Sequence, residues 1–139
     1  MTTSGLMPDV EMVVIGWLQG QPDLAGVTVA SRVPSTYDGS QRVVRIFRTG
    51  GFMDQSLPFA VDHARLDIDC FGPDKGTAHD LMALVRKLVL SDARTANFSA
   101  FNASVHDTLE YVGPQWMDEP DYPNAGRYLI QVGLSLKPA

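Results

Sequence analysis

The sequence predicts a single α+β domain over residues 1–139, a mainly antiparallel sheet of about four to five strands with two helices packed on one face. Two stretches carry apolar residues at helical spacing, and five show the alternation or the β-branched and aromatic content of strands. Their order is helix, three strands, helix, two strands, and short turns between consecutive strands favour antiparallel pairing. The 139 residues, 45% of them hydrophobic, suit one domain with a real core.

Both helices are predicted from their apolar spacing and from residues that suit helix ends. The first begins after Pro8 and Asp9, because an aspartate there caps free backbone N–H groups, and it ends at Gly20. The second follows residues 72–74 and continues to Ser91. The apolar stripes, which we interpret as core, comprise Val10, Val13, Val14, Trp17 and Leu18 in the first helix and Ala78, Leu81, Met82, Val85, Leu88 and Val89 in the second.

The first two strands are predicted at residues 27–33 and 42–49 from their alternation and their β-branched content. Turn residues between them, including Asp38-Gly39, favour a hairpin with a loop longer than the tightest kind. Gly50-Gly51 then interrupts the pattern. Residues 50–60 are therefore predicted to form a loop that is rich in apolar side chains.

Three further strands complete the predicted sheet. Residues 63–71 alternate well, so one face of this strand is apolar and the other is expected to face solvent. The fourth strand is expected at residues 95–111, with a bulge or bend, and the fifth at residues 127–136, with Gly113-Pro114 and residues 120–126 as loops. The face assignment in the third strand is Leu66, Ile68 and Cys70 on the apolar side, and Arg65, Asp67 and Asp69 on the polar side.

Charge and cysteine content limit the classes of partner. A net charge of −5 argues against tight binding of nucleic acid, which draws on Lys and Arg to replace counterions, and an acidic surface would repel DNA. The single cysteine, Cys70, excludes an intramolecular disulfide and favours a reducing compartment. Residues 1–7 are expected to be a flexible lead-in without the features of a signal peptide, and no apolar run is long enough to span a bilayer.

The sequence offers no convincing combination of reactive group, partner and orienting group, so we expect no catalytic, cofactor-binding or metal-binding residues. Asp62, His63, Asp67 and Asp69 are near one another in sequence, but alternation assigns Asp67 and Asp69 to a solvated strand face. Cys70 lies on the apolar face of the same strand, where a thiol is usually inert. The chain is therefore predicted not to be an enzyme.

Large apolar residues remain in the predicted loops, with Phe52, Leu57 and Phe59 in one and Trp116 and Met117 in another. Loops normally run over the surface, and exposed apolar patches mark interfaces. The alternative is that these loops fold back onto the core. The sequence leaves both interpretations open for Phe52 and Trp116.

Four features occur in order along nearly the whole chain. They are a helix ending in Trp17-Leu18 before a strand closing at Val33-Pro34; residues 42–48 running into Thr49-Gly50-Gly51; residues 62–71 leading through Gly72 into a helix with Leu84-Val85-Arg86; and Gly113-Pro114-Gln115-Trp116 before a closing Arg127-Tyr128 strand. This succession resembles the tail terminator (tail completion) proteins of long, non-contractile-tailed phages.

The resemblance implies a structural virion protein, assembled in the host cytoplasm. Family members form rings, generally hexamers, that cap the head-proximal end of the tail tube. The cap ends polymerisation at the length set by the tape measure protein and presents a surface for joining the head. The implied partners are further copies of the chain, the major tail tube protein, a head–tail connector or stopper protein and the tape measure protein. Genomic DNA would pass through the lumen without specific binding, and no membrane or cofactor is implied.

Two segments are the candidate contact sites between subunits. The glycines of the first would set its loop conformation, and an arginine there could pair with a neighbour's carboxylate. Phe52 and Trp116 would act as anchors, because aromatic residues often dominate interface energies. The first segment comprises Arg48, Gly50, Gly51 and Phe52, and the second comprises Gln115, Trp116 and Met117.

Three alternatives remain beside the terminator. A neighbouring head–tail neck protein shares the small α+β plan. A cytosolic ligand-binding α+β domain should instead enclose one apolar pocket. A small enzyme should lose activity when His63, Cys70 or His106 is changed.

Overall fold

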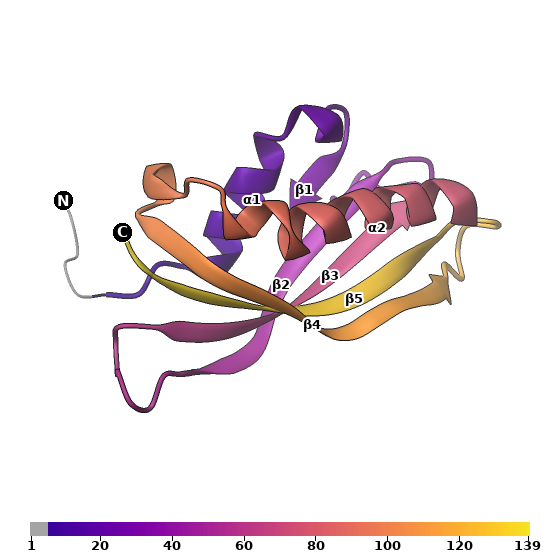
Figure 1. Ribbon diagram of the computed structural model, residues 1–139. Helices are drawn as coiled ribbons and strands as arrows, with labels where there is room; N and C mark the ends of the chain where they lie inside the picture. Colours follow the sequence, from indigo (N-terminus) through magenta and orange to yellow (C-terminus); the bar gives the residue numbers. More distant parts are fainter. Residues whose placement is uncertain (1–5) are drawn as a thin grey trace.

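A computed structural model describes residues 6–139 as a five-stranded sheet with two helices on one of its faces (Figure 1). The expected α+β class and element order are confirmed, while residues 1–5 of the expected flexible lead-in lie outside the described residues. The helices are α1 (Val10–Gln19) and α2 (Lys75–Leu90), and the strands are β1 (Thr28–Ala30), β2 (Val43–Met53), β3 (Asp62–Gly72), β4 (Ala103–Asp118) and β5 (Gly126–Pro138). Short 3₁₀ turns lie at Pro22–Leu24, Asp92–Arg94 and Ser99–Phe101.

The strands lie in the order β1-β2-β3-β5-β4, and every pairing except the first is antiparallel. The hairpin expected between residues 27–33 and 42–49 is wrong, because β1 runs parallel to β2 with Thr28 opposite Val43. The connection at residues 31–42 is about the dozen residues that a parallel crossover requires, so it can return the chain to the same end of the sheet. β1 is also shorter than expected.

A long hairpin arm occupies the region that was predicted to be a loop, so that prediction is wrong. β2 continues through Gly50 and Gly51 to Met53, after a register shift between Arg48 and Gly50, and only residues 54–61 form the connection to β3. Positive φ angles of 119° at Gly50 and 101° at Gly51 accommodate this bulge without ending the ladder. Residues 48–66, hereafter the arm, project below the helical layer in Figure 1.

β4 also differs from its expected position. It starts at Ala103, because residues 92–101 contain two 3₁₀ turns, and it continues through Gly113-Pro114 to Asp118 where a loop was expected. A proline is tolerated there because β4 is the edge strand and its missing N–H need not face the ladder. Register shifts interrupt the pairing of β4 with β5 at three points.

The core lies between the helices and the sheet. Both predicted apolar stripes are buried, including Trp17, which packs against Phe98 with ring centroids 5.2 Å apart. The expected cap is confirmed at α1, where Asp9 Oδ1 accepts from the Glu11 N–H at 3.0 Å, and Asp74 Oδ1 caps α2 by accepting from the Thr77 N–H at 2.8 Å. The sheet closes this core from below. It contributes the apolar face predicted for the third strand and the alternate residues of β5 from Ile130 to Leu136.

The thiol of Cys70 provides a probe of this core. It is fully buried on the helix-facing side of β3, and burial raises its pKa well above the usual value, so the reactive thiolate does not form near neutral pH. We expect a maleimide reagent to leave the native protein unmodified for hours and to modify one thiol per chain in denaturant. Rapid modification of the native protein, followed by mass spectrometry, would contradict this placement.

Candidate functional site

Arg48 joins the two strands of the arm and links the arm to α1. Its guanidinium donates two hydrogen bonds to the buried carboxylate of Asp62, at 2.7 and 2.8 Å, which raises the pKa of Arg48, and Nε donates to the Gly50 carbonyl at 2.8 Å. The backbone N–H of Arg48 donates to Glu11 of α1 at 3.0 Å. The carboxylate that engages Arg48 is therefore inside the chain, whereas the sequence pointed to one on a neighbour.

A second polar cluster fixes the turn of the arm. His63 Nε2 lies 2.9 Å from Asp54 Oδ2, and His63 Nδ1 lies 2.8 Å from the Ser135 hydroxyl. The hydrogen bond to His63 lowers the pKa of Asp54, whose other oxygen accepts from the N–H groups of Ser56 and Leu57 at 2.9 Å. The stabilising contribution of Asp54 is thus complete above the usual carboxyl pKa and is lost as the pH falls through the lowered value.

These three side chains have the composition of a hydrolase triad, but the surroundings do not support that chemistry. A serine nucleophile requires N–H donors aimed at the developing oxyanion. Ser135 lies within β5, whose backbone pairs with β3 on one side and β4 on the other, so the nearby N–H groups belong to the ladder. The cluster is better explained as the support of the arm.

A shallow groove lies beside this cluster, on the sheet face opposite the helices. Phe52, His63, Leu109 and Tyr111 line it, together with Gly133 and Ser135, and its volume is about 140 Å³. Three of the lining side chains are substantially exposed, Phe52 at 58%, Tyr111 at 45% and Leu109 at 43%.

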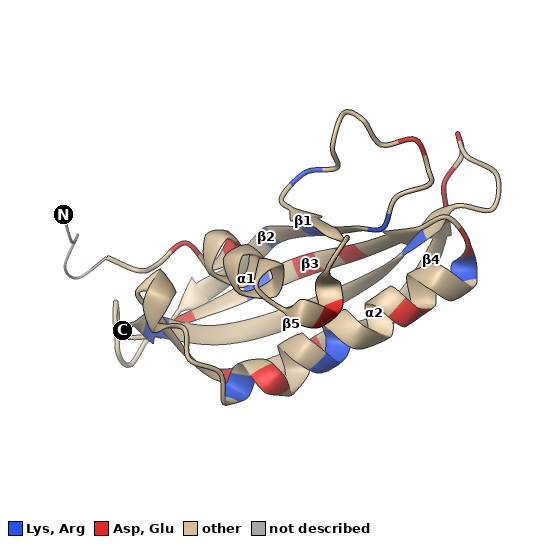
Figure 2. Cartoon of the chain, turned by 90° about the horizontal axis from the view of Figure 1, so that it is seen from above, with Lys and Arg blue, Asp and Glu red and all other residues tan. Residues whose placement is uncertain are grey.

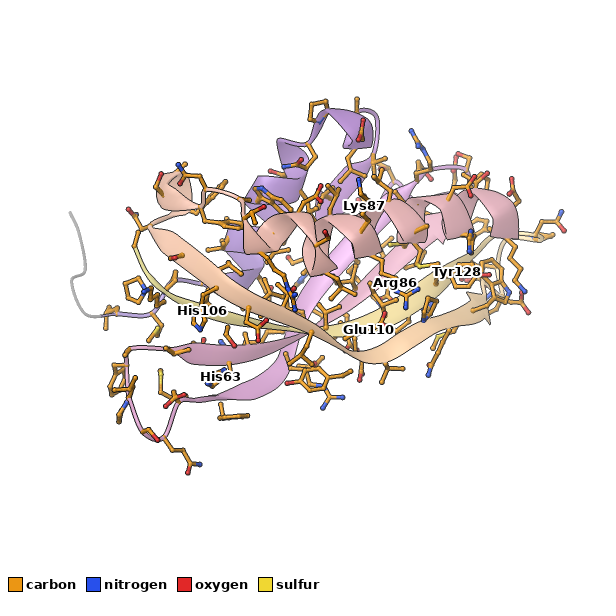
Figure 3. All side chains as sticks on the ribbon, viewed as in Figure 1. His63, Arg86, Lys87, His106, Glu110 and Tyr128 are labelled. Carbon is orange, nitrogen blue, oxygen red and sulfur yellow. The ribbon has the colours of Figure 1, made fainter. Side chains whose placement is uncertain are left out.

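Tyr111 is held in place at the groove by close packing. Its ring lies against Gly133, where an added Cβ would be only 2.7 Å from a ring carbon, and the Arg65 guanidinium stacks 4.6 Å from the ring centroid. Figure 3 shows His63 on the arm, away from the Arg86–Glu110 pair, which links α2 to β4 with an Nε–Oε1 distance of 2.7 Å. The groove therefore has a fixed floor and open aromatic walls.

The second candidate segment lies at the far end of β4. Trp116 is half-buried on the helix side, where it stacks on Tyr128 at 5.2 Å and lies under Lys75, while its indole N–H donates to Asp118 at 2.8 Å. Gln115 is exposed and Met117 is half-buried. Trp116 thus combines both interpretations left open by the sequence, since one side packs on the subunit and the other remains accessible.

The two candidate segments occupy diagonally opposite corners of the sheet. Trp116 is level with Tyr128, Cys70 and Val44 across the ladder. Phe52 lies eight positions further along β2 than Val44, which is a displacement of about 26 Å along the strand direction. β1 pairs only with residues 43–45, and no other strand of residues 6–139 pairs with the outer edge of β2. The outer edge of β4 is likewise open, so each segment adjoins an unpaired strand edge.

Comparison with protein families identifies the family to which the chain belongs. A family model described as phage tail termination protein matches residues 6–133, which is most of the chain. The chain is a member of this family. It is therefore a structural protein of the phage tail, and the terminator identity predicted from the sequence is confirmed. Curated protein sequences offer no match.

The groove of this terminator was not found from its sequence. Its walls come from the arm, β4 and β5, which are far apart along the chain. A partial signal existed, because Leu109 and Tyr111 are large apolar residues spaced by two within a predicted strand, and therefore lie on one face. The spacing alone does not distinguish a contact surface from an ordinary strand face.

The terminator also has a polar cluster at the end of the sheet near Trp116. Here the expectation that Asp69 faces solvent is wrong, whereas Arg65 and Asp67 of the same predicted face are partly exposed. Asp69 is buried, and its carboxylate receives hydrogen bonds from Arg45, with Nε at 2.8 Å, while Arg127 Nε lies 3.2 Å away as an ion pair. Phe71 lies beneath both guanidinium groups. Alternation along the strand assigns Asp69 to the polar face. It does not reveal the two arginines that permit burial of this carboxylate.

The remaining surface of the terminator has no single charged patch over its helices, since both signs are interspersed along α2 in Figure 2. Within residues 6–139, no group of three or more His, Cys, Asp or Glu side chains is arranged to hold a metal ion. Neither α1 nor α2, in this same part of the chain, combines the length and apolar character of a membrane-crossing helix.

Proposed function

We propose that copies of this terminator form a closed ring, a hexamer, at the head-proximal end of the tail tube. The ring ends tube polymerisation and presents the surface to which the head is joined. The observation that carries this proposal is the placement of two different accessible segments at opposite corners of one sheet. A cyclic ring requires two distinct, complementary patches on each subunit, because every contact is head-to-tail.

The strand directions support such a closure. β2 and β4 run antiparallel to each other within the subunit, and both present an open outer edge. Rotation about an axis along the strands would bring the β2 edge of one subunit beside the β4 edge of the next in antiparallel order. Exposed edges invite pairing with another chain unless they are blocked.

Charge is consistent with the passage of DNA through the lumen. The chain carries a net charge of −5, and a negatively charged ring repels phosphates and so does not retain the duplex. The proposed partners are further copies of the chain, the major tail tube protein and a head–tail connector or stopper, with the tape measure protein inside the tube below.

The proposal is tested by the size and shape of the assembled protein. We expect light scattering and negative-stain imaging to show rings of about six subunits, or caps on tubes of the tail tube protein where the tubes end. A strict monomer that leaves tube ends bare at high protein concentration would refute the proposal. Binding to filled heads without binding to tubes would instead assign the chain to the neighbouring neck.

A further inference from the structure

Phe59, at the tip of the arm, combines two unfavourable features that the subunit itself does not explain. Its φ angle is 60°, in the left-handed region that residues other than Gly, Asn and Asp rarely adopt, and its side chain is 66% exposed. The turn is closed by the Ala60 N–H donating to the Leu57 carbonyl at 3.1 Å, and Leu57 is 59% exposed. A backbone outlier that presents an aromatic ring to solvent indicates use outside the subunit.

The groove beside the Asp54–His63–Ser135 cluster has the size of such a ring. Its volume of about 140 Å³ is close to that of the apolar cavity of about 150 Å³ that holds a benzene molecule in an engineered protein. Phe52, Leu109 and Tyr111 supply apolar walls, and Phe59 is not among the residues that line it. One chain therefore carries both an apolar projection and an apolar recess, at separate positions.

We propose that the Phe59 ring of one subunit docks in the groove of a second copy, between Phe52, Leu109 and Tyr111. The inference concerns this pairwise contact. That repeated contacts close a ring rests on the proposed function. A second copy is the occupant because the projection and the recess differ, as a head-to-tail contact requires. Neither Leu57 nor Phe59 brings a charge into the groove, and the one imidazole there is already engaged by Asp54 and Ser135.

The areas involved agree with a partial contact within a larger junction. From their exposed fractions, Leu57 and Phe59 offer roughly 230 Å² and the three groove walls roughly 300 Å², so the two sides match. Their total of about 500 Å² is well below the 1,200–2,000 Å² of a stable interface. The contact therefore selects the neighbour while other surfaces, such as the open strand edges, complete the junction.

Cross-linking between differently labelled copies tests the contact directly. Chains carrying Ala60→Cys, which keeps the Phe59 ring and places the thiol in the exposed turn beside it, are mixed with chains carrying Leu109→Cys, allowed to assemble, and treated with a short bismaleimide. Cys70 is buried and does not compete. We expect cross-linked pairs joining the two variants, and far fewer when Leu109→Cys is replaced by Met12→Cys, which lies on α1 and is more exposed, at 63% against 43%. Equal yields for the two partners would overturn the inference.

A second variant separates the contact from folding and from the ring. Phe59→Asn removes the aromatic ring while placing at this φ a residue that tolerates it, so the thermal midpoint should stay equal or rise. Self-association should weaken on the order of 30-fold, as for loss of an interface anchor, while Met12→Asn leaves it unchanged.

Rings that form normally with Phe59→Asn refute the contact but not the ring. Cross-linked pairs without rings refute the ring but not the contact. Normal rings that no longer cap tubes would assign Phe59 to the tube protein.

Discussion

Replacement of Gly51 by alanine is expected to detach the arm from the sheet. A Cβ at this position would lie 2.1 Å from the His63 carbonyl oxygen and 2.9 Å from the Ala64 Cα, both backbone atoms that cannot rotate away. The φ angle of 101° adds strain for any residue with a Cβ. Strain and overpacking together should destabilise the paired arm by about 4 kcal/mol.

Hydrogen exchange is the measurement that locates this loss. Amides of residues 51–53 and 62–64 should lose protection, because the arm can open without unfolding the core, while amides of α2 change little. The adjacent Gly50→Ala is the matched control. Gly50 has a φ of 119°, but nothing lies within 4 Å of an added Cβ, so only strain of about 1–2 kcal/mol is expected. Equal effects of the two substitutions would show that the contact with His63 is unimportant.

Loss of the arm should also abolish assembly if the groove is used as inferred. Phe52 and His63 face each other across the β2–β3 ladder and form one wall of the groove. Once the arm opens, that wall and the position of Phe59 are lost together. Gly51→Ala should therefore yield a folded monomer whose Cys70 remains unreactive, which distinguishes a local opening from global unfolding.

The sequence located the helices and the core because those signals are local. Apolar spacing and the caps at Asp9 and Asp74 depend on neighbours within a turn or two. The direction of β1 cannot be predicted from such local signals, because alternation is the same in parallel and antiparallel strands. The connection that sets it is held by Tyr37, whose ring contacts Phe71 and Tyr122 from distant parts of the chain.

The error at Gly50-Gly51 has a similar origin. A turn and a bulge both require positive φ, so two glycines indicate either. Pairing of Gly50 with Arg65 and of Gly51 with Ala64 decides for the bulge, and that pairing is a tertiary fact. The sequence leaves open whether Phe52 is accessible or folds back onto the core, and the structure exposes it. The groove beside it depends on β4 and β5 and cannot be foreseen from residues 50–60 alone.

Asp67 and Asp69 show how strongly the environment separates two residues with the same position in the pattern. Asp69→Ala should lower the free energy of unfolding by about 3 kcal/mol, because it leaves Arg45 and Arg127 facing each other with no carboxylate between them. Both guanidiniums are less than a third exposed, so solvent screens their repulsion only in part. Urea unfolding monitored by circular dichroism measures the loss.

Asp67→Ala, two residues away on the same face, is the matched control. Asp67 is half-buried and its one hydrogen bond, 3.3 Å from the Thr49 hydroxyl, is long, so a loss of less than about 1 kcal/mol is expected. Equal losses would mean that burial of Asp69 contributes nothing. Recovery of stability when Arg45→Met and Arg127→Met are combined with Asp69→Leu would show that the single substitution fails through unpaired charge, since a buried ionic cluster can be replaced by apolar residues of similar volume. Because Arg127 pairs with Met117 across β4 and β5, Asp69→Ala should also loosen the Trp116 segment, and weaker ring formation is expected even where the chain stays folded.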